Sequence, residues 1–223
     1  MNNSTLDIIK NSIFATLGLM AFAFGTYLII QANIGVDPWD AFCLGLADKL
    51  GILYGTANII ISFTIIGIDL LLKEKIGIGT VLDAIVVGKT VDLLNWIDLI
   101  PKQDNLLVGI LMLIIGFFIA GFSQYIYMKA GLCCGPRDAF QVALARRLYK
   151  LSMGSVNILI LSVVLIIAWI LGGPLGIGTL ISPFAAGIMQ QFAFNVMKFE
   201  PRNVKHQDII ESMKVITARE KIL

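Results

Sequence analysis

Two short stretches place ionisable side chains inside an otherwise apolar chain. "GVDPWDAF" carries Asp37, Trp39 and Asp40, and "GPRDAF" carries Arg137 and Asp138 at the matching place 98 positions later. Carboxylates beside a guanidinium can bind a charged or hydrogen-bonding solute, and ionisable groups within a membrane mark functional sites. No Ser/His or Cys/His set accompanies them, so nucleophilic catalysis is not indicated. We therefore expect a binding site and no enzyme activity.

Cysteine and histidine usage gives no sign of a metal or cofactor. Cys43, Cys133 and Cys134 form no C-x-x-C pair, and His206 lies in the polar tail. No tetrahedral metal set can be assembled from these residues. The vicinal Cys133 and Cys134 are better explained as small apolar fillers than as a redox pair. We expect no metal and no cofactor.

Composition indicates a polytopic membrane protein in contact with the lipid bilayer. The 223 residues are 57% hydrophobic and 14% charged, whereas soluble domains carry about a quarter charged residues. The net charge of +2 is small and its basic residues are dispersed, which argues against a nucleic-acid partner. A homo-oligomer is neither required nor excluded by the sequence.

An all-α fold of six membrane spans and two shorter helices is expected. About 20 apolar residues cross a bilayer as a helix. The first run is longer than a signal-peptide core and no A-x-A site follows it, so it counts as a span. Segments 37–50 and 136–150 are too short to cross, at about 21 Å each. The six expected spans are 11–31, 53–72, 77–98, 106–128, 153–172 and 175–197.

The chain contains an internal repeat. "DAFCLGLADKL" from Asp40 returns as "DAFQVALARRL" from Asp138, and "GIGT" occurs at Gly77 and again at Gly176. Glycines also match, Gly55 with Gly154 and Gly88 with Gly187. These matches predict two repeats, 1–103 and 104–198, each built as span, short helix, span, span. With three crossings per repeat the second repeat is inverted; with four, the repeats are parallel.

The distribution of Lys and Arg favours the inverted arrangement. Six spans place fourteen basic residues inside and two outside, whereas eight spans give twelve and four. Cytoplasmic loops are enriched in Lys and Arg. Six spans also put Tyr54, Trp96 and Trp169 near the outer interface, where amphipathic rings prefer to lie. Both termini are then cytoplasmic.

In this arrangement the two short helices would meet near the middle of the bilayer. Pro38 and Pro136 suit the first position of a helix, and Asp37 suits its N-cap. The candidate binding site therefore comprises Asp37, Trp39, Asp40, Arg137 and Asp138. A purely structural role stays open, because carboxylates in the first turn complement the helix dipole and Arg137 can neutralise one of them.

The third expected span carries Asp83, Lys89 and Asp92, whose repeat partners are not charged. Lys89 and Asp92 are three residues apart and can pair on one helix face. Two interpretations remain open: an ion pair that stabilises the bundle, or a proton or ion relay. Beyond the last span, segment 199–223 has apolar residues at helical spacing and predicts an amphipathic helix on the cytoplasmic surface. A partner-binding tail is the alternative.

The motifs "GVDPWDAF", "GPRDAF" followed by "LARRL", and the repeated "GIGT" resemble the YitT/YczE-type bacterial integral membrane proteins. The resemblance covers roughly residues 18–194. It implies a multi-pass protein of the bacterial inner (plasma) membrane with a permease-like architecture.

Three function classes follow from these observations. The favoured class is a transporter that moves a small polar or anionic solute by alternating access, with proton coupling through a carboxylate. A cation held by the carboxylates is the rival within this class. The second class is a non-transporting membrane accessory or scaffold protein, and the third and weakest is an intramembrane enzyme.

Overall fold

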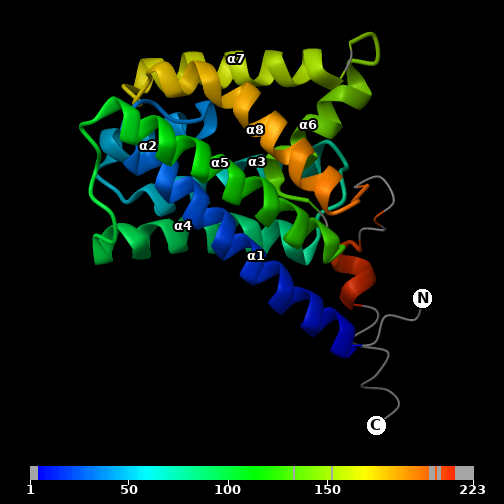
Figure 1. Ribbon diagram of the computed structural model, residues 1–223. Helices are drawn as coiled ribbons and strands as arrows, with labels where there is room; N and C mark the ends of the chain where they lie inside the picture. Colours follow the sequence, from blue (N-terminus) through cyan, green and yellow to red (C-terminus); the bar gives the residue numbers. More distant parts are fainter. Residues whose placement is uncertain (1–4, 133, 152, 201–203, 205–206, 214–223) are drawn as a thin grey trace.

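A computed structural model describes residues 5–132, 134–151, 153–200, 204 and 207–213, which are helical apart from their connections (Figure 1). Each expected span and each short segment corresponds to one helix, although α1 begins before residue 11 and α6 ends before residue 150. The eight helices are α1 (Thr5–Gln31), α2 (Pro38–Leu50), α3 (Tyr54–Leu71), α4 (Ile78–Ile97), α5 (Leu106–Lys129), α6 (Pro136–Arg147), α7 (Met153–Leu171) and α8 (Ile177–Val196).

Four helices, α1, α3, α5 and α8, are long and apolar enough to cross a membrane by length and composition. Helix α4 has the same length as α8. It differs in carrying three ionisable residues, Asp83, Lys89 and Asp92. In α7 the part Ser155–Leu171 is apolar but shorter than the four.

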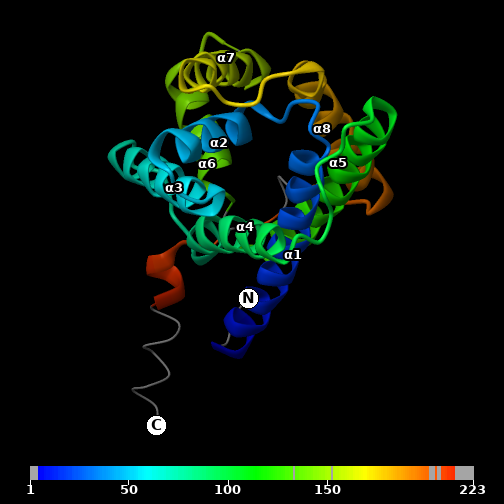
Figure 2. The same ribbon diagram turned by 90° about the vertical axis from the view of Figure 1, so that its left-hand side faces the viewer.

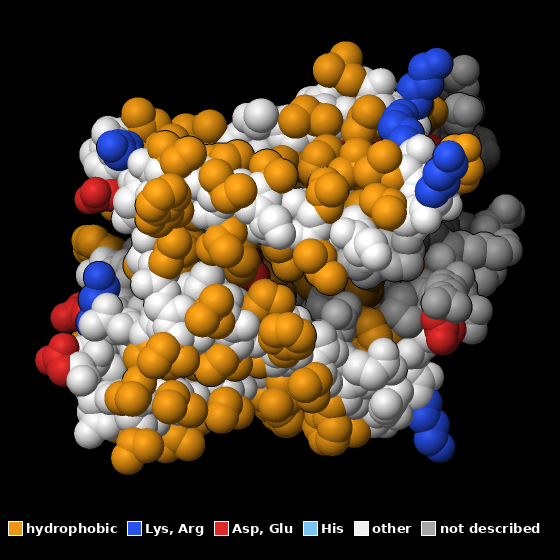
Figure 3. All heavy atoms as spheres, turned by 90° about the horizontal axis from the view of Figure 1, so that it is seen from above, with side chains coloured by type: hydrophobic (Ala, Val, Ile, Leu, Met, Phe, Trp, Pro, Cys, Tyr) orange, Lys and Arg blue, Asp and Glu red, His pale blue; other side chains and the backbone are white. Residues whose placement is uncertain are grey.

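The surface has an apolar middle and charged ends, as expected for a protein within a bilayer. Figure 3 shows hydrophobic side chains over the middle of one face, with charged side chains gathered at its two ends. This face includes α7 and α8, where Ile158, Ile166, Leu180 and Phe184 are all more than half exposed. Soluble proteins rarely expose continuous apolar areas of this kind, so the face suits contact with lipid.

Close helix packing at glycines forms the centre of the fold. Helices α1 and α5 lie side by side, α4 packs against α1, and α8 packs against α5 (Figure 1). A side chain at Gly25 or Gly116 would meet the backbone of the other helix, so small residues let α1 and α5 approach. The short helices pack on the opposite half of the chain: α2 on α7, and α6 on α3 (Figure 2).

Two hydrogen bonds of equal length cross between the halves of the chain. The carbonyl of Ile34 accepts from Gly178 N–H, and the carbonyl of Leu132 accepts from Gly79 N–H, both at 2.8 Å. These positions match one another in the sequence repeat. In each case the connection before a short helix is tied to the "GIGT" start of a long helix from the other half.

The two halves differ at one seam. Helix α3 packs on α4, with Gly55 and Gly88 so close that neither position has room for a side chain. At Gly187, the sequence match of Gly88, a Cβ would meet nothing within 4 Å. Helices α7 and α8 do not pack along their lengths as α3 and α4 do. Figure 3 shows a recess in the middle of this face with an acidic side chain visible in it.

The described part of the tail, which includes a helical turn at residues 209–213, docks on the protein. Ile209 N–H donates to the carbonyl of Ile76 at 2.9 Å, and Gln207 N–H donates to the carbonyl of Gly131 at 2.8 Å. The Ile209 side chain packs beside Ile76, whereas Ile210 is 66% exposed. The amphipathic pattern therefore includes a contact with the α3–α4 connection; residues 214–223 lie outside the described residues.

Candidate binding site

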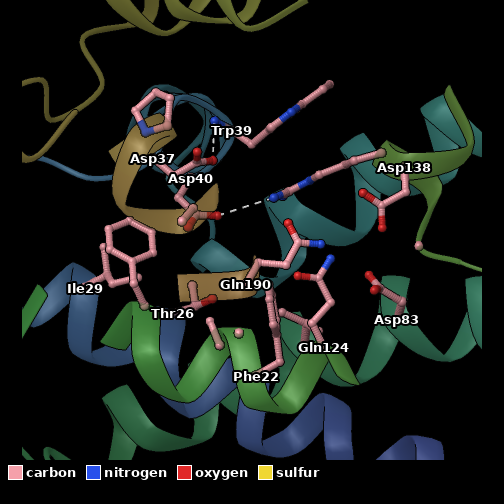
Figure 4. Close-up of a pocket in the computed structure, with 18 of the residues that line it drawn as sticks. Phe22, Thr26, Ile29, Asp37, Trp39, Asp40, Asp83, Gln124, Asp138 and Gln190 are labelled. Atoms are coloured by element: carbon pink, nitrogen blue, oxygen red, sulfur yellow. Dashed lines mark hydrogen bonds and ion pairs between the residues drawn. The ribbon is translucent and has the colours of Figure 1, made fainter. Parts of the chain in front are cut away.

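A cavity of about 300 Å³ lies at the centre of the protein and is lined by residues from all eight helices (Figure 4). Every predicted binding residue lines it. Asp37, Trp39 and Asp40 line it from α2 and its N-cap, and Arg137 and Asp138 line it from α6. Asp83, for which the sequence left a stabilising ion pair and a relay open, lines the same cavity from α4.

Asp37 begins α2, as expected for its position before proline. Its Oδ2 accepts a hydrogen bond from Trp39 N–H at 3.0 Å, while Pro38 occupies the first helical position. The carboxylate thus satisfies one of the free N–H groups that every helix start leaves.

Asp40 and Arg137 form a pair across the two halves of the chain. Arg137 Nη1 lies 3.5 Å from Asp40 Oδ1, and Tyr54 O–H donates to the same oxygen at 2.9 Å. Arg137 Nη2 also donates to Asn58 Oδ1 at 2.8 Å, and the guanidinium lies 5.3 Å from the centre of the Trp39 ring. The pairing expected for Arg137 is confirmed. It neutralises a carboxylate that is only 6% exposed.

Asp83 and Asp138 have a different environment. Both point into the cavity in Figure 4, near Gln124 and Gln190. No hydrogen bond or ion pair from the described residues reaches either carboxylate. Asp83 lies against the start of α6, where a Cβ added to Gly135 would be 2.8 Å from Asp83 Oδ2.

Lys89 and Asp92, the other two ionisable residues of the third expected span, lie away from this cavity. Asp92 is nine positions from Asp83, which at about 100° per residue places it on the opposite face of the helix. There it accepts a hydrogen bond from Gly55 N–H at 2.7 Å. Lys89 is exposed, and the ion pairs of the described residues do not join it to Asp92. The structure thus separates Asp83 from Lys89 and Asp92.

Several lining residues were not identified from the sequence. Tyr54 was expected at the outer interface, but it is 6% exposed because its hydroxyl reaches inward to Asp40. Gln124 and Gln190 were not singled out, although amides within apolar spans are a detectable signal. No group of three or more His, Cys, Asp or Glu side chains placed to hold a metal ion occurs in the described ranges. Cys133 lies outside them.

An all-helical chain with several apolar spans and a polar cavity between them is a polytopic membrane protein. The chain belongs to the DUF6198 family, a family of unknown function whose model matches residues 9–195. This membership agrees with the YczE-type resemblance of its motifs.

Curated relatives extend over most of the chain. It is 29% identical over 189 residues to the uncharacterized membrane protein YczE of Bacillus subtilis, covering 84% of this chain and 86% of YczE. It is 27% identical over 189 residues to an uncharacterized protein of Haemophilus influenzae, covering 82% of this chain and 85% of that protein. It is 28% identical to the uncharacterized protein YyaS of Bacillus subtilis over 178 residues, which is 78% of this chain and 87% of YyaS. No solved structure matches the chain.

Proposed function

We propose that the protein is a permease-like transporter that binds a small polar solute in the central cavity and moves it by alternating access. The observation that carries this proposal is the cavity itself, which lies between apolar helices, is bounded by all eight of them and brings charged and amide side chains together with apolar ones. Polar groups within a membrane are costly, and a cavity with a few converging polar groups is the usual form of a small-molecule site.

The proposed topology has six spans, with both termini cytoplasmic and α2 and α6 entering the membrane without crossing it. At about 1.5 Å per residue, α2 spans roughly 20 Å and α6 roughly 18 Å, less than a hydrocarbon core of about 30 Å. The two crossed hydrogen bonds, Ile34 to Gly178 and Leu132 to Gly79, support two repeats of like structure. The distribution of Lys and Arg supports their inverted orientation. In such transporters the site lies at the interface of the repeats.

The unequal seams support alternating access. The first repeat is closed where Gly55 meets Gly88, whereas the second has open space at Gly187. If the repeats exchange conformations, α7 closes on α8 while α3 separates from α4, and the cavity opens to the other side of the membrane. A rigid scaffold would have no use for this asymmetry.

The cavity lining also bears on the charge of the solute and on the ion whose movement is coupled to transport. The sequence favoured a polar or anionic solute because helix N-termini and Arg137 attract negative groups. Asp83 and Asp138, without partners among the described residues, are the groups that would carry a coupled proton. The lining contains no histidine, serine or cysteine among the described residues, which supports binding without catalysis.

Cysteine accessibility tests this proposal without knowledge of the solute. Gln190→Cys, which faces the cavity, is placed in a chain without native cysteines and exposed to a membrane-impermeant thiol reagent in right-side-out and in inverted vesicles. We expect labelling from both sides. The matched control is Ile188→Cys on the same helix, which is 65% exposed and faces outward, and which should react from neither side. Labelling of Gln190→Cys from one side or neither would favour the accessory-protein role.

A second test addresses the site residues once a transported solute is known. Flux in proteoliposomes should collapse in Arg137→Ala and in Asp138→Asn while both variants remain folded. If the two variants are inactive only because they do not fold, these residues are structural.

A further inference from the structure

The lining of the cavity has an excess of negative charge. It contains four aspartates, Asp37, Asp40, Asp83 and Asp138, and one basic residue, Arg137. Two of the aspartates have partners: Asp37 caps α2, and Asp40 is bound by Tyr54 and Arg137. Arg137 is held in turn by Asp40 and Asn58. The remaining two carboxylates, Asp83 and Asp138, therefore determine which charge the rest of the cavity can accept.

Carboxylates of the protein lie at both helix starts where an anion would bind. At the start of α2, Trp39 N–H donates to Asp37. At the start of α6, the Asp83 carboxylate lies against Gly135, the N-cap residue. A negative ligand at the start of α2 would have to displace the Asp37 carboxylate, and one at the start of α6 would be repelled by Asp83. Its attraction to Arg137 would compete with Asp40. An anion is therefore disfavoured at all three of its candidate contacts.

A cation would instead relieve the repulsion between two unpaired carboxylates. Asp83 and Asp138 come from different helices and point toward the same space, beside the amides of Gln124 and Gln190 (Figure 4). Like charges in a low-dielectric space repel, and an opposite charge between them is stabilising. The amide oxygen of Gln124 offers a further acceptor for N–H groups.

The shape and the walls of the cavity indicate which kind of cation fits. Phe22, Phe117 and Tyr127 line it from α1 and α5. Aromatic faces attract ammonium groups and also cover the apolar part of an organic ligand. The volume of about 300 Å³ is at the small end of ligand sites. We infer that the cavity binds a small organic ammonium ion, with its N–H groups held between Asp83 and Asp138 and its apolar part against these aromatic rings.

This inference rests on the proposed function, because it names the substrate class of the same cavity. Three probes of one shape separate charge from size: benzylammonium, benzoate and benzyl alcohol. The readout is protection of Gln190→Cys from the thiol reagent in purified protein. We expect benzylammonium to slow labelling at least tenfold at saturation, and neither of the other two to slow it.

Substitutions of the two aspartates test whether their carboxylates bind the ammonium group. Asp83→Asn and Asp138→Asn should each weaken the protection by benzylammonium at least tenfold, and Asp138→Glu should retain it. The matched control is Asp98→Asn, which removes a carboxylate outside the cavity at a left-handed position that asparagine tolerates. The three probes are also compared on the protein that carries Gln190→Cys and both aspartates. That comparison decides whether the bound ligand is positive or negative, even if a carboxylate variant does not fold.

The outcomes separate this inference from the transport proposal. Protection by benzoate alone, equal protection by all three probes, or protection by none overturns the cationic assignment. Each of these results leaves the transport proposal standing as long as Gln190→Cys is labelled from both sides of the membrane. Loss of labelling from one side overturns alternating access, whichever probe binds.

Discussion

Asp92 of α4 accepts a hydrogen bond from the backbone N–H of Gly55 at 2.7 Å, and so caps α3 from a neighbouring helix. Leu53, the N-cap residue of α3, provides no side-chain hydrogen bond of its own. One turn before Asp92, Gly88 touches Gly55 through backbone atoms. The capping carboxylate and the two glycines together close the seam between α3 and α4.

The glycine contact predicts unequal effects of one substitution at two matched positions. Gly88→Ala should destabilise the protein by about 1–3 kcal/mol, because the added methyl group meets the backbone of Gly55. Gly187→Ala should be neutral or slightly stabilising, because nothing lies within 4 Å and alanine favours helix. Thermal unfolding in detergent measures both. Equal losses would mean that the seams are alike, and the asymmetry would then be wrong.

The cap itself predicts that the oxygen at position 92 matters more than its charge. Asp92→Ala leaves Gly55 N–H without its acceptor, at a cost of about 1–3 kcal/mol. Asp92→Asn keeps an amide oxygen in place and should lose less than half as much. The comparison is made by denaturant unfolding. If Asp92→Asn is as damaging as Asp92→Ala, the negative charge contributes through another contact.

How far the sequence alone predicts this structure depends on the range of each interaction. The starts of α2 and α6 were predictable because Asp37, Pro38 and Pro136 act locally. The meeting of Asp40 with Arg137 was predictable because the repeat supplied long-range information. The role of Asp92 was not, since its partner lies on another helix and local spacing suggested Lys89. The contact of Tyr54 with Asp40 was not predictable for the same reason, since it joins two helices.

The Arg137–Asp40 pair predicts strong coupling between two substitutions. Arg137→Met leaves Asp40 buried without its cation and should cost about 3–5 kcal/mol. When Asp40→Asn is combined with Arg137→Met, position 40 no longer carries a buried charge without its partner, and the amide oxygen introduced by Asp40→Asn can still accept from Tyr54. The double variant should therefore be more stable than Arg137→Met alone, as measured by a double-mutant cycle. Additive losses would show that the two side chains act independently.

Tail docking should depend on pH through contacts at Lys75. The pKa of Asp208 is lowered because its carboxylate accepts from Glu211 N–H and lies 3.4 Å from Lys75 Nζ. The pKa of Lys75 is raised, mainly by its hydrogen bond to Glu211. Because the pKa of Asp208 is lowered, its ionised carboxylate stabilises the docked tail at pH values above the ordinary pKa of 3.8. This stabilisation is lost as the pH falls through the lowered pKa. Because the pKa of Lys75 is raised, its ammonium group stabilises the docked tail at pH values below the ordinary pKa of 10.5. This stabilisation is lost as the pH rises through the raised pKa.

Docking is therefore expected to be strongest between those two ordinary values and to weaken in acid. Hydrogen exchange of the Ile209 amide, which is bonded to the carbonyl of Ile76, measures it after correction for intrinsic rates. Lys75→Met should lower protection near neutral pH and flatten its pH dependence. An unchanged profile in that variant would mean that the tail is held by its backbone bonds and by Ile209 alone.

Topology can be decided by two exposed lysines in the connections that flank α4. With six spans, Lys73 is cytoplasmic and Lys102 is extracellular; if α2 also crosses, the two positions exchange sides. Lys73→Cys and Lys102→Cys, in a chain without native cysteines, should react with an impermeant thiol reagent from opposite sides of the membrane. We expect Lys73→Cys to react only in inverted vesicles and Lys102→Cys only in right-side-out vesicles, because the six-span arrangement places most of the basic residues inside. The reverse pattern would contradict six spans with cytoplasmic termini, because it requires either that α2 cross the membrane, with parallel repeats, or that both termini lie outside.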